Sequence, residues 1–236
     1  MRNAFWNRLS ERKYLVLLLT VASTIVVQPL AHGFLAGLIF YEVLRTLFVV
    51  TVLFIVFQRR HVRLVSLLIG LPVIASNWAH YTVPERFEPA LAVIHHAFLV
   101  ALLGFAVTVI LRRIFERKVV GGDDVLGAIC GYLLAGIAWG SLYLLVELLV
   151  PGSFSVHQAI AGQLGGWYAR QAVFDYYSLM TLTTLGYGDI TPIRPPARSL
   201  TWMEAMFGQF YIAVIVAQLV GLRLAEALQP PDQKST

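Results

Sequence analysis

Long blocks of apolar residues alternate with short polar segments along most of the chain. Six blocks have, or approach, the roughly 20 apolar residues that a helix needs to cross the hydrocarbon layer of a membrane. A seventh segment, at 171–184, is amphiphilic and ends in threonines; it is too short to span, so it predicts a helix that enters the membrane and turns back. The six blocks predict transmembrane helices over residues 14–31, 34–57, 62–79, 89–111, 124–150 and 198–224.

The amino-acid composition is typical of an integral membrane protein. Of the 236 residues, 58% are hydrophobic and 13% are charged, and the mean hydropathy is +0.72. A soluble domain carries about 25% charged residues, so a water-soluble enzyme and a disordered chain are both excluded. The single cysteine, Cys130, excludes a disulfide within the chain and a metal site of several thiolates. We therefore expect an all-α integral membrane protein.

The basic residues predict how the chain lies in the membrane. Cytoplasmic loops of membrane proteins carry an excess of lysine and arginine. Thirteen basic residues precede the first span, join spans two and three, join spans four and five, or follow the sixth. We expect these on the cytoplasmic side of the cell membrane, together with both termini, and 151–197 open to the outside. The net charge of +5 is then explained by topology, and no nucleic-acid partner is expected. Four basic residues fall on the outer side: Arg86, Arg170, Arg194 and Arg198.

A change in the chain near residues 119–124 suggests two units. Four spans with short loops occupy 1–118, and a span, the re-entrant segment and a further span occupy 119–228. Residues 229–236 form a short polar tail that we expect in the cytoplasm, and no soluble ligand-binding domain is expected after the last span. In the fifth span, Gly127 and Gly131, and likewise Gly136 and Gly140, are spaced so that another helix can approach closely.

The run Thr181-Leu-Thr-Thr-Leu-Gly-Tyr-Gly-Asp189 carries the candidate chemistry. A ring of backbone carbonyls can replace the hydration shell of an ion. Aiming successive carbonyls at one axis requires backbone angles that glycine adopts easily, and Gly186 and Gly188 alternate with larger residues. The hydroxyl of Thr184 adds an inner ligand, and the side chains of Leu185 and Tyr187 are expected to point away from the ions. One chain supplies one strand, so several chains are required.

This run resembles the selectivity filter of tetrameric potassium channels, whose hallmark is Thr-Thr-x-Gly-Tyr-Gly-Asp. The match comprises Thr183, Thr184, Gly186, Tyr187, Gly188 and Asp189, and Leu185 replaces the valine that is more usual at that position. The resemblance extends over about 119–224. It implies a homotetramer in which 119–228 forms the pore from an outer helix, a pore helix, a filter strand and an inner helix. It also implies K⁺ binding by the backbone carbonyls of Thr184, Leu185, Gly186 and Tyr187.

Further roles follow from the same resemblance. Tyr176 is expected to support the filter by hydrogen-bonding Asp189, beside Thr183. Gly208, 22 residues after Gly186, matches the hinge glycine of the inner helix, and close packing is the alternative reading of it. Gln209 and Ile212 are then expected to line the cavity beneath the filter. Met180 departs from the family, because some bacterial members have a glutamate there.

The first 118 residues look like a voltage-sensor-type domain that lacks the sensor charges. Such sensors use several arginines in the fourth helix, because one charge crossing 100 mV contributes only about 2.3 kcal/mol. The span 89–111 contains no arginine or lysine, and Arg112 and Arg113 follow it. We expect a six-span channel of prokaryotic type without steep voltage dependence.

Several ionisable residues lie at membrane depth. Glu42 and Arg45, three residues apart, predict a buried ion pair or a gating latch. Glu204 is expected either to line the cavity or to brace the back of the pore helix. His95 and His96 are candidates for pH sensing, with burial in the bundle as the plainer reading.

The sequence favours a potassium-selective channel, and a non-selective monovalent cation channel is the alternative. A potassium transporter carries four filter-like loops on one chain, and this chain has one. Because no Gly-x-Ser-x-Gly, His-Glu-x-x-His or phosphate-binding motif occurs, an enzyme is not expected. No cofactor is expected beyond the permeant K⁺, and the expected partners are copies of the chain and membrane lipid.

Overall fold

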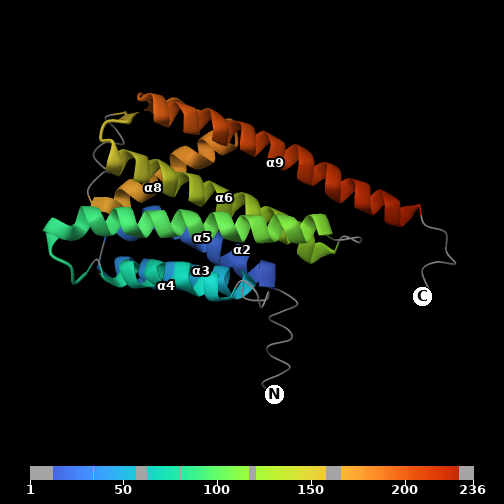
Figure 1. Cartoon of the computed structure of the whole chain (residues 1–236), viewed down its shortest axis with the longest axis horizontal. Helices are drawn as coiled ribbons and strands as arrows, with labels where there is room; N and C mark the ends of the chain where they lie inside the picture. The colour runs from blue at the N-terminus through green and yellow to red at the C-terminus, as the bar shows by residue number, and fades with distance from the viewer. Residues whose placement is uncertain are drawn as a thin grey trace, which may run out of the picture.

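The structure is a computed structural model that describes residues 13–33, 35–56, 63–79, 81–116, 121–157 and 166–228. Helices make up most of it (Figure 1). In chain order the elements are α2 (Lys13–Val27), the 3₁₀ turn η1 (Gln28–Gly33), α3 (Leu35–Val56), α4 (Arg63–Ala79), the 3₁₀ turn η3 (Glu85–Phe87), α5 (Glu88–Glu116), α6 (Gly122–Leu149), β1 (Phe154–Val156), α8 (Gly166–Leu182), β2 (Ile190–Pro192) and α9 (Pro195–Ala227).

Four helical segments are long and apolar enough to cross a membrane: Gly37–Val56, Glu85–Glu116, Gly122–Leu149 and Pro195–Leu224. This agrees with an all-α membrane protein. The other two predicted spans are shorter as helices, with 15 residues in α2 and 17 in α4, so a six-span arrangement stays a prediction. The predicted span 14–31 ends early because Pro29 lacks an N–H and disfavours helical geometry in the residue before it.

Helices α2, α3, α4, α5 and α6 share one hydrophobic core. Leu17 of α2, Val52 of α3, Leu102 of α5 and Leu134 of α6 all belong to this cluster and are almost fully buried. In Figure 1, α5 and α6 lie side by side along most of their lengths. The N-terminal helices are therefore packed directly on α6.

The glycines of α6 allow close approach by two other helices, α2 and α8. A Cβ at Gly127 would lie 3.1 Å from the Tyr14 ring of α2, and one at Gly136 would lie 2.8 Å from Leu179 of α8. At Gly140 it would lie 2.9 Å from the backbone of Asp175. The glycine pairs thus seat α8 and α2 on α6, because a larger residue would push the neighbouring element away.

A second cluster of aromatic side chains fixes the end of the molecule where α6 ends. Phe154 of β1 packs edge-to-face on Tyr143, Phe174 and Tyr177, with ring centroids 5.1–5.5 Å apart. Strand β1 pairs with β2 in antiparallel register, with Val156 opposite Ile190. These three-residue strands were not predicted.

The carboxylate of Glu147 holds the turn that leads into β1. It accepts hydrogen bonds from the backbone N–H groups of Gly152, Ser153 and Phe154 at 2.9, 2.9 and 3.2 Å. The structure gives it a specific task, because three backbone donors would otherwise lose their acceptor.

Helix α8 enters the molecule beside the end of α6 and stops partway along α6 and α9, and the chain then returns toward the start of α9 (Figure 1). This is the re-entrant path that the sequence predicts, although the helix begins at Gly166 rather than near 171. Residues 185–187 are not assigned to a helix or a strand. Strand β2 begins only at Ile190, so the predicted filter strand is an irregular segment without ladder partners in the described chain.

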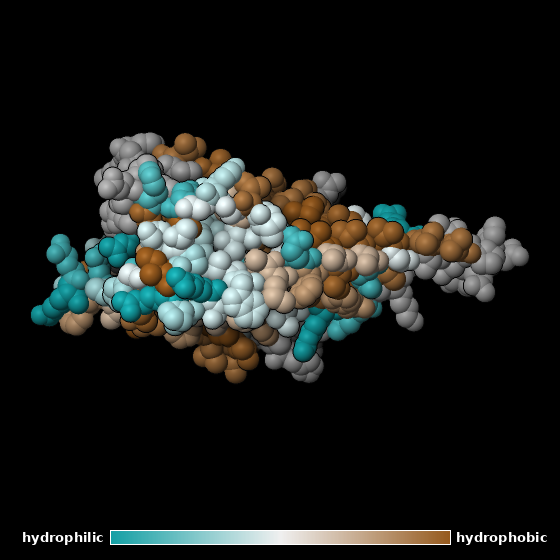
Figure 2. Space-filling model, turned by 90° about the horizontal axis from the view of Figure 1, so that it is seen from above, coloured by the Kyte–Doolittle hydropathy of each residue, from teal (hydrophilic) through white to brown (hydrophobic). Residues whose placement is uncertain are grey.

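Helix α9 buries only one stripe of side chains against its own chain. Between Glu204 and Leu224 the buried residues of the stripe are Glu204, Gly208, Tyr211 and Ile215, spaced by three or four residues, and Ala197 is buried nearer the start of the helix. The 18-residue apolar window of this helix is only 17% buried. Figure 2, seen from the α9 side, shows the apolar band that continues along this helix toward its C-terminal end. Most of α9 is therefore available to lipid or to further protein.

Candidate functional site

The chain turns sharply as it leaves α8 and forms the candidate filter segment, residues 184–188. The N–H of Thr183 donates to the carbonyl of Leu179 at 3.1 Å, and its hydroxyl donates to the same carbonyl at 2.6 Å. The N–H groups of Leu185 and Gly186 both donate to the carbonyl of Met180, at 2.9 and 3.2 Å. The start of the segment is thus fastened to the last turn of the helix.

Alternate residues of the segment have positive φ. The angles are 59° at Thr184, 51° at Gly186 and 78° at Gly188, and neither Leu185 nor Tyr187 has a positive φ. In an ordinary extended chain successive peptide groups point in opposite directions. Because φ alternates in sign along this segment, successive carbonyls are brought toward the same side. Thr184 pays a conformational cost for a left-handed backbone, and such strain concentrates at functional sites.

Asp189 ties the outer end of the segment to its surroundings. The Tyr176 hydroxyl donates to Oδ2 of Asp189 at 2.6 Å, as the resemblance implied. The N–H of Ile190 donates to Oδ1 at 3.1 Å. The backbone N–H of His157, just after β1, donates to the Asp189 carbonyl at 2.9 Å. The segment is therefore anchored to α8 through a side chain and to the β1 region through the backbone.

The other end of the segment lies against α9. The amide of Gln209 is 3.4 Å from the hydroxyl of Thr184, which places this side chain under the segment, and Ile212 lies exposed one turn further along. A Cβ at Gly208 would lie 2.2 Å from the carbonyl oxygen of Leu182. Gly208 thus permits backbone contact between α9 and the end of α8. Helix α9 runs unbroken through this position, and the hinge role of Gly208 stays a prediction.

Glu204 faces the back of α8 rather than the front of the segment. Its side chain is fully buried, with Oε1 2.5 Å from the hydroxyl of Ser178 on α8. Its other oxygen accepts from the hydroxyl of Tyr143 on α6. Of the two arrangements that the sequence left open, the structure has the one in which Glu204 packs against the back of α8, the predicted pore helix.

Glu42 and Arg45 form the ion pair that their spacing suggested, with Oε1 and Nη1 3.6 Å apart. The amide of Asn77 donates to the other Glu42 oxygen at 2.5 Å. Arg45 Nη2 also lies 2.8 Å from Nε2 of His95, whose Nδ1 is 2.8 Å from the hydroxyl of Ser76. Since arginine only donates, Nε2 must be the acceptor and His95 is neutral in this arrangement. The pair therefore belongs to a buried polar network joining α3, α4 and α5.

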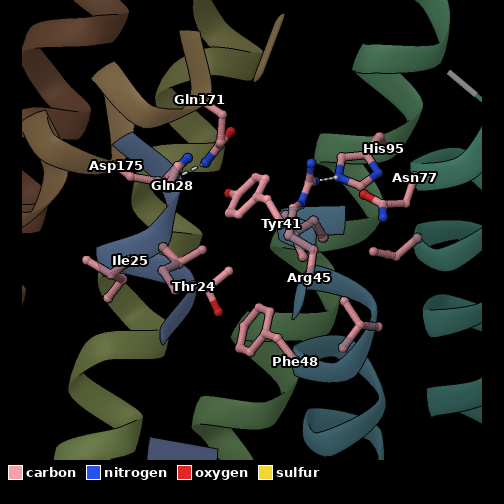
Figure 3. A pocket seen from close by; sticks show the side chains of 14 residues that line it. Thr24, Ile25, Gln28, Tyr41, Arg45, Phe48, Asn77, His95, Gln171 and Asp175 are labelled. Carbon is pink, nitrogen blue, oxygen red and sulfur yellow. Dashed lines mark hydrogen bonds between the residues drawn. The ribbon is translucent and has the colours of Figure 1, made fainter. Parts of the chain in front are cut away.

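This network borders a cavity of about 40 Å³ between the N-terminal helices and α8. On the α8 side, the amides of Gln28 and Gln171 donate to the two oxygens of Asp175 at 3.2 and 2.5 Å. Most of the cavity lining is apolar, but polar side chains face it from both sides, and its volume leaves room for an ordered water molecule. In Figure 3 Arg45, His95 and Asn77 lie on one side, Gln28, Gln171 and Asp175 on the other, and the Tyr41 ring between the two groups.

Sequence reasoning missed the Gln28–Asp175 contact. The available signal was the pair Gln171 and Asp175, two polar residues four apart on one face of the re-entrant helix. Gln28 is 147 positions away in the chain from Asp175, and no local pattern links them. The contact joins the first predicted unit to the second.

The candidate filter segment is exposed in the single chain. Leu185 is 53% and Tyr187 69% exposed, so the expected packing of these side chains behind the segment has no partner among the described residues of the chain. Irregular backbone at membrane depth is tolerated only where it is buried in protein or lines a water-filled cavity. A single copy provides neither.

Comparison with known proteins identifies the same part of the chain. A family model described as "Ion channel" matches residues 131–222, a range that runs from α6 through α8 and the candidate filter segment into α9. No curated protein and no solved structure matches the chain. The family match, together with the four apolar helices, supports a membrane protein with ion-channel activity.

Proposed function

We propose that this protein is a potassium-selective channel that lets K⁺ flow passively across the cell membrane through a filter of backbone carbonyls. The observation that carries this proposal is the alternation of positive φ at Thr184, Gly186 and Gly188 within the Thr-Thr-x-Gly-Tyr-Gly-Asp run. The carbonyls of Thr184, Leu185, Gly186 and Tyr187 replace the hydration shell of the ion, and K⁺ is the permeant species.

The pore helix adds to this environment. The C-terminal end of α8 carries roughly half a negative charge from its aligned peptide dipoles, and the segment begins at that end. Several such ends around one axis favour a cation that has lost part of its hydration shell. No catalytic step is involved, because conduction requires only binding and release of the ion.

Four copies of the chain form the pore in this proposal. The exposure of the segment and of most of α9 supports this, since neighbouring copies would cover both. Leu185 and Tyr187 then pack on adjacent subunits and hold the segments in place. Native mass spectrometry of the detergent-solubilised protein is expected to give about four times the 26.3 kDa of one chain.

The topology completes the proposal. Both termini lie in the cytoplasm, and the loops around the outer end of the filter face outward, because the basic residues concentrate on the opposite side. In this arrangement six helices of each subunit cross the membrane, and the re-entrant pore helix enters it and turns back. The residues up to 118 form a voltage-sensor-like unit, and 119–228 form the pore.

Reversal potentials measured on purified protein in planar bilayers test the proposal. With K⁺ on one side and Na⁺ on the other, a potassium-selective pore gives a reversal potential far from zero, in the direction that opposes K⁺ flow out of the K⁺ side, and Ba²⁺ blocks the current. A reversal potential near zero in the same gradient identifies the alternative, a non-selective monovalent cation channel. Absence of any flux from liposomes that contain correctly assembled protein contradicts both.

A further inference from the structure

Glu204 occupies the junction of three helices behind the candidate filter segment. It lies on α9 and contacts Tyr143 of α6 and Ser178 of α8, and both Glu204 and Ser178 are fully buried. A charged carboxylate in such a place is costly unless a cation or several donors compensate it. The partners that contact the two oxygens of Glu204 are both neutral hydroxyl groups, those of Tyr143 and Ser178.

The hydrogen atoms at this junction can be counted. The oxygen of Ser178 lies 2.6 Å from the carbonyl oxygen of Gly136 and 2.5 Å from Oε1 of Glu204. Two oxygen–oxygen contacts of this length each need a hydrogen between the atoms. The Ser178 hydroxyl has one hydrogen and the Gly136 carbonyl has none. The second hydrogen must come from the carboxyl group of Glu204.

We propose that Glu204 is a neutral carboxylic acid and that its proton positions the pore helix. In this arrangement the Tyr143 hydroxyl donates to one Glu204 oxygen, the Glu204 hydroxyl donates to Ser178, and Ser178 donates to the carbonyl of Gly136. Each hydroxyl hydrogen in this series of hydrogen bonds then has an acceptor, and the proton of Glu204 links α6, α8 and α9. Glu204 acts as a positioning residue, because it contacts α8 and not the ion.

Loss of this proton has a defined consequence. With a carboxylate at Glu204, the single hydrogen of Ser178 cannot serve both neighbours, so either the contact with Glu204 or the contact with Gly136 becomes repulsive. Ser178 would then shift relative to α6. The candidate filter segment begins six residues after Ser178, at Thr184, so a shift of α8 is passed on to it. The groups facing Glu204 that can titrate are tyrosines, Tyr132 and Tyr143 from α6 and Tyr177 from α8. All of them are neutral at physiological pH, so the proton of Glu204 is the first to be lost as the pH rises.

Infrared spectroscopy of the purified protein tests the protonation state directly. A protonated carboxylic acid has a carbonyl stretch at higher frequency than any carboxylate band. We expect this band at neutral pH in the wild type and in Glu85→Gln, which alters an exposed carboxyl group, and its loss in Glu204→Gln. In Ser178→Ala the band should remain but shift, because the acid has lost its acceptor. If Glu204→Gln leaves the acid band of the wild type unchanged, the proposal is wrong.

The pH dependence of the current tests the positioning role, which rests on the proposed function. Glutamine at 204 can donate to Ser178 and accept from Tyr143 but has no proton to lose. We expect wild-type current to change as the pH is raised and Glu204→Gln to lose this response. An equal alkaline response in both proteins would refute the positioning role. The infrared result does not depend on conduction. A protein that shows the acid band but carries no K⁺ current would therefore contradict the proposed function, while the protonation of Glu204 would stand.

Discussion

Glycine 188 combines a φ of 78° with open space around the position that a Cβ would take. The same holds for Gly186, whose φ is 51°. At both positions glycine is required by the backbone angle alone, since nothing lies within 4 Å to exclude a methyl group. Substitution of either glycine within one chain therefore tests the backbone geometry of the segment without adding a steric clash.

Replacement of Gly188 by alanine is therefore expected to act through φ. A left-handed backbone costs about 1–2 kcal/mol for a residue with a Cβ, and each copy in the assembly contributes that cost. The segment should relax, rotate its carbonyls and lose potassium selectivity, which a shift of the K⁺/Na⁺ reversal potential toward zero measures.

Gly104→Ala is the matched control for this substitution. Gly104 also has no atom within 4 Å of its Cβ position, but it lies in a helix with ordinary backbone angles. Selectivity should be unchanged in this variant. Equal effects of the two substitutions would mean that positive φ at Gly188 is not needed for selectivity.

The hydrogen bond between Tyr176 and Asp189 leads to a second prediction. Tyr176→Phe removes a donor that lies 2.6 Å from the carboxylate, and the loss of such a bond costs about 1 kcal/mol. Because Asp189 also anchors the segment to β1, we expect the K⁺ current to decay faster under sustained driving force. Asp189→Asn should have a similar effect. Additive effects in the double variant would contradict a shared hydrogen bond as the cause.

At the scale of single residues, the features predictable from the sequence are those formed by residues close together in the chain. The Thr-Thr-x-Gly-Tyr-Gly-Asp run indicated positive φ at Gly186 and Gly188 but not at Thr184. The spacing of Glu42 and Arg45 indicated an ion pair. Contacts between distant segments were not predictable. Gln28 and Asp175, or Glu204 and Tyr143, meet only because whole helices pack together.

At the scale of elements, the contact between α8 and α9 depends on Gly208. A methyl group there would lie 2.2 Å from a backbone oxygen of α8, and a backbone atom cannot turn aside as a flexible side chain can. Gly208→Ala should therefore displace α9 from α8, lower the yield of assembled protein and abolish the current. Size-exclusion chromatography and flux from liposomes measure the two effects.

Gly221→Ala is the matched control on the same helix, since no atom lies within 4 Å of its Cβ position. Alanine also has a higher helix propensity than glycine, by about 1 kcal/mol. The assembly should be as stable as the wild type, or more so. A normal assembly and current in Gly208→Ala would show that α9 does not need this close approach.

Element boundaries were predictable where the signal is periodic or long. The positions of α3, α5, α6 and α9 follow from apolar blocks of spanning length. Helix α2 ends at Val27 because Pro29 interrupts a block that hydropathy alone continues to residue 31. Strands β1 and β2 have three residues each, and their pairing arises from the meeting of two distant loops, which no alternation in so short a segment can indicate.

At the scale of the whole molecule, the N-terminal helices are packed on α6 and reach α8. The hydrophobic core runs from α2 through α5 into α6, and Gln28 contacts Asp175 of α8. The N-terminal helices thus support α8, the predicted pore helix. Whether they also sense voltage depends on how much charge they can move.

The distribution of charge in these helices predicts a weak response to voltage. Between Glu88 and Leu111, α5 has no lysine or arginine, and His95 is neutral because it accepts a hydrogen bond from Arg45. Arg45 itself is paired with Glu42 on the same helix, so movement of α3 carries almost no net charge through the field. Each charge that crosses fully contributes about 2.3 kcal/mol per 100 mV, and several per subunit are needed for steep gating. The open probability of single channels should therefore vary little between strongly negative and positive voltages. A steep sigmoidal rise of open probability with voltage would require charge movement that these helices do not provide. The variant Glu42→Gln leaves Arg45 without its counter-charge. If α3 moves during gating, this variant should respond more steeply to voltage than the wild type.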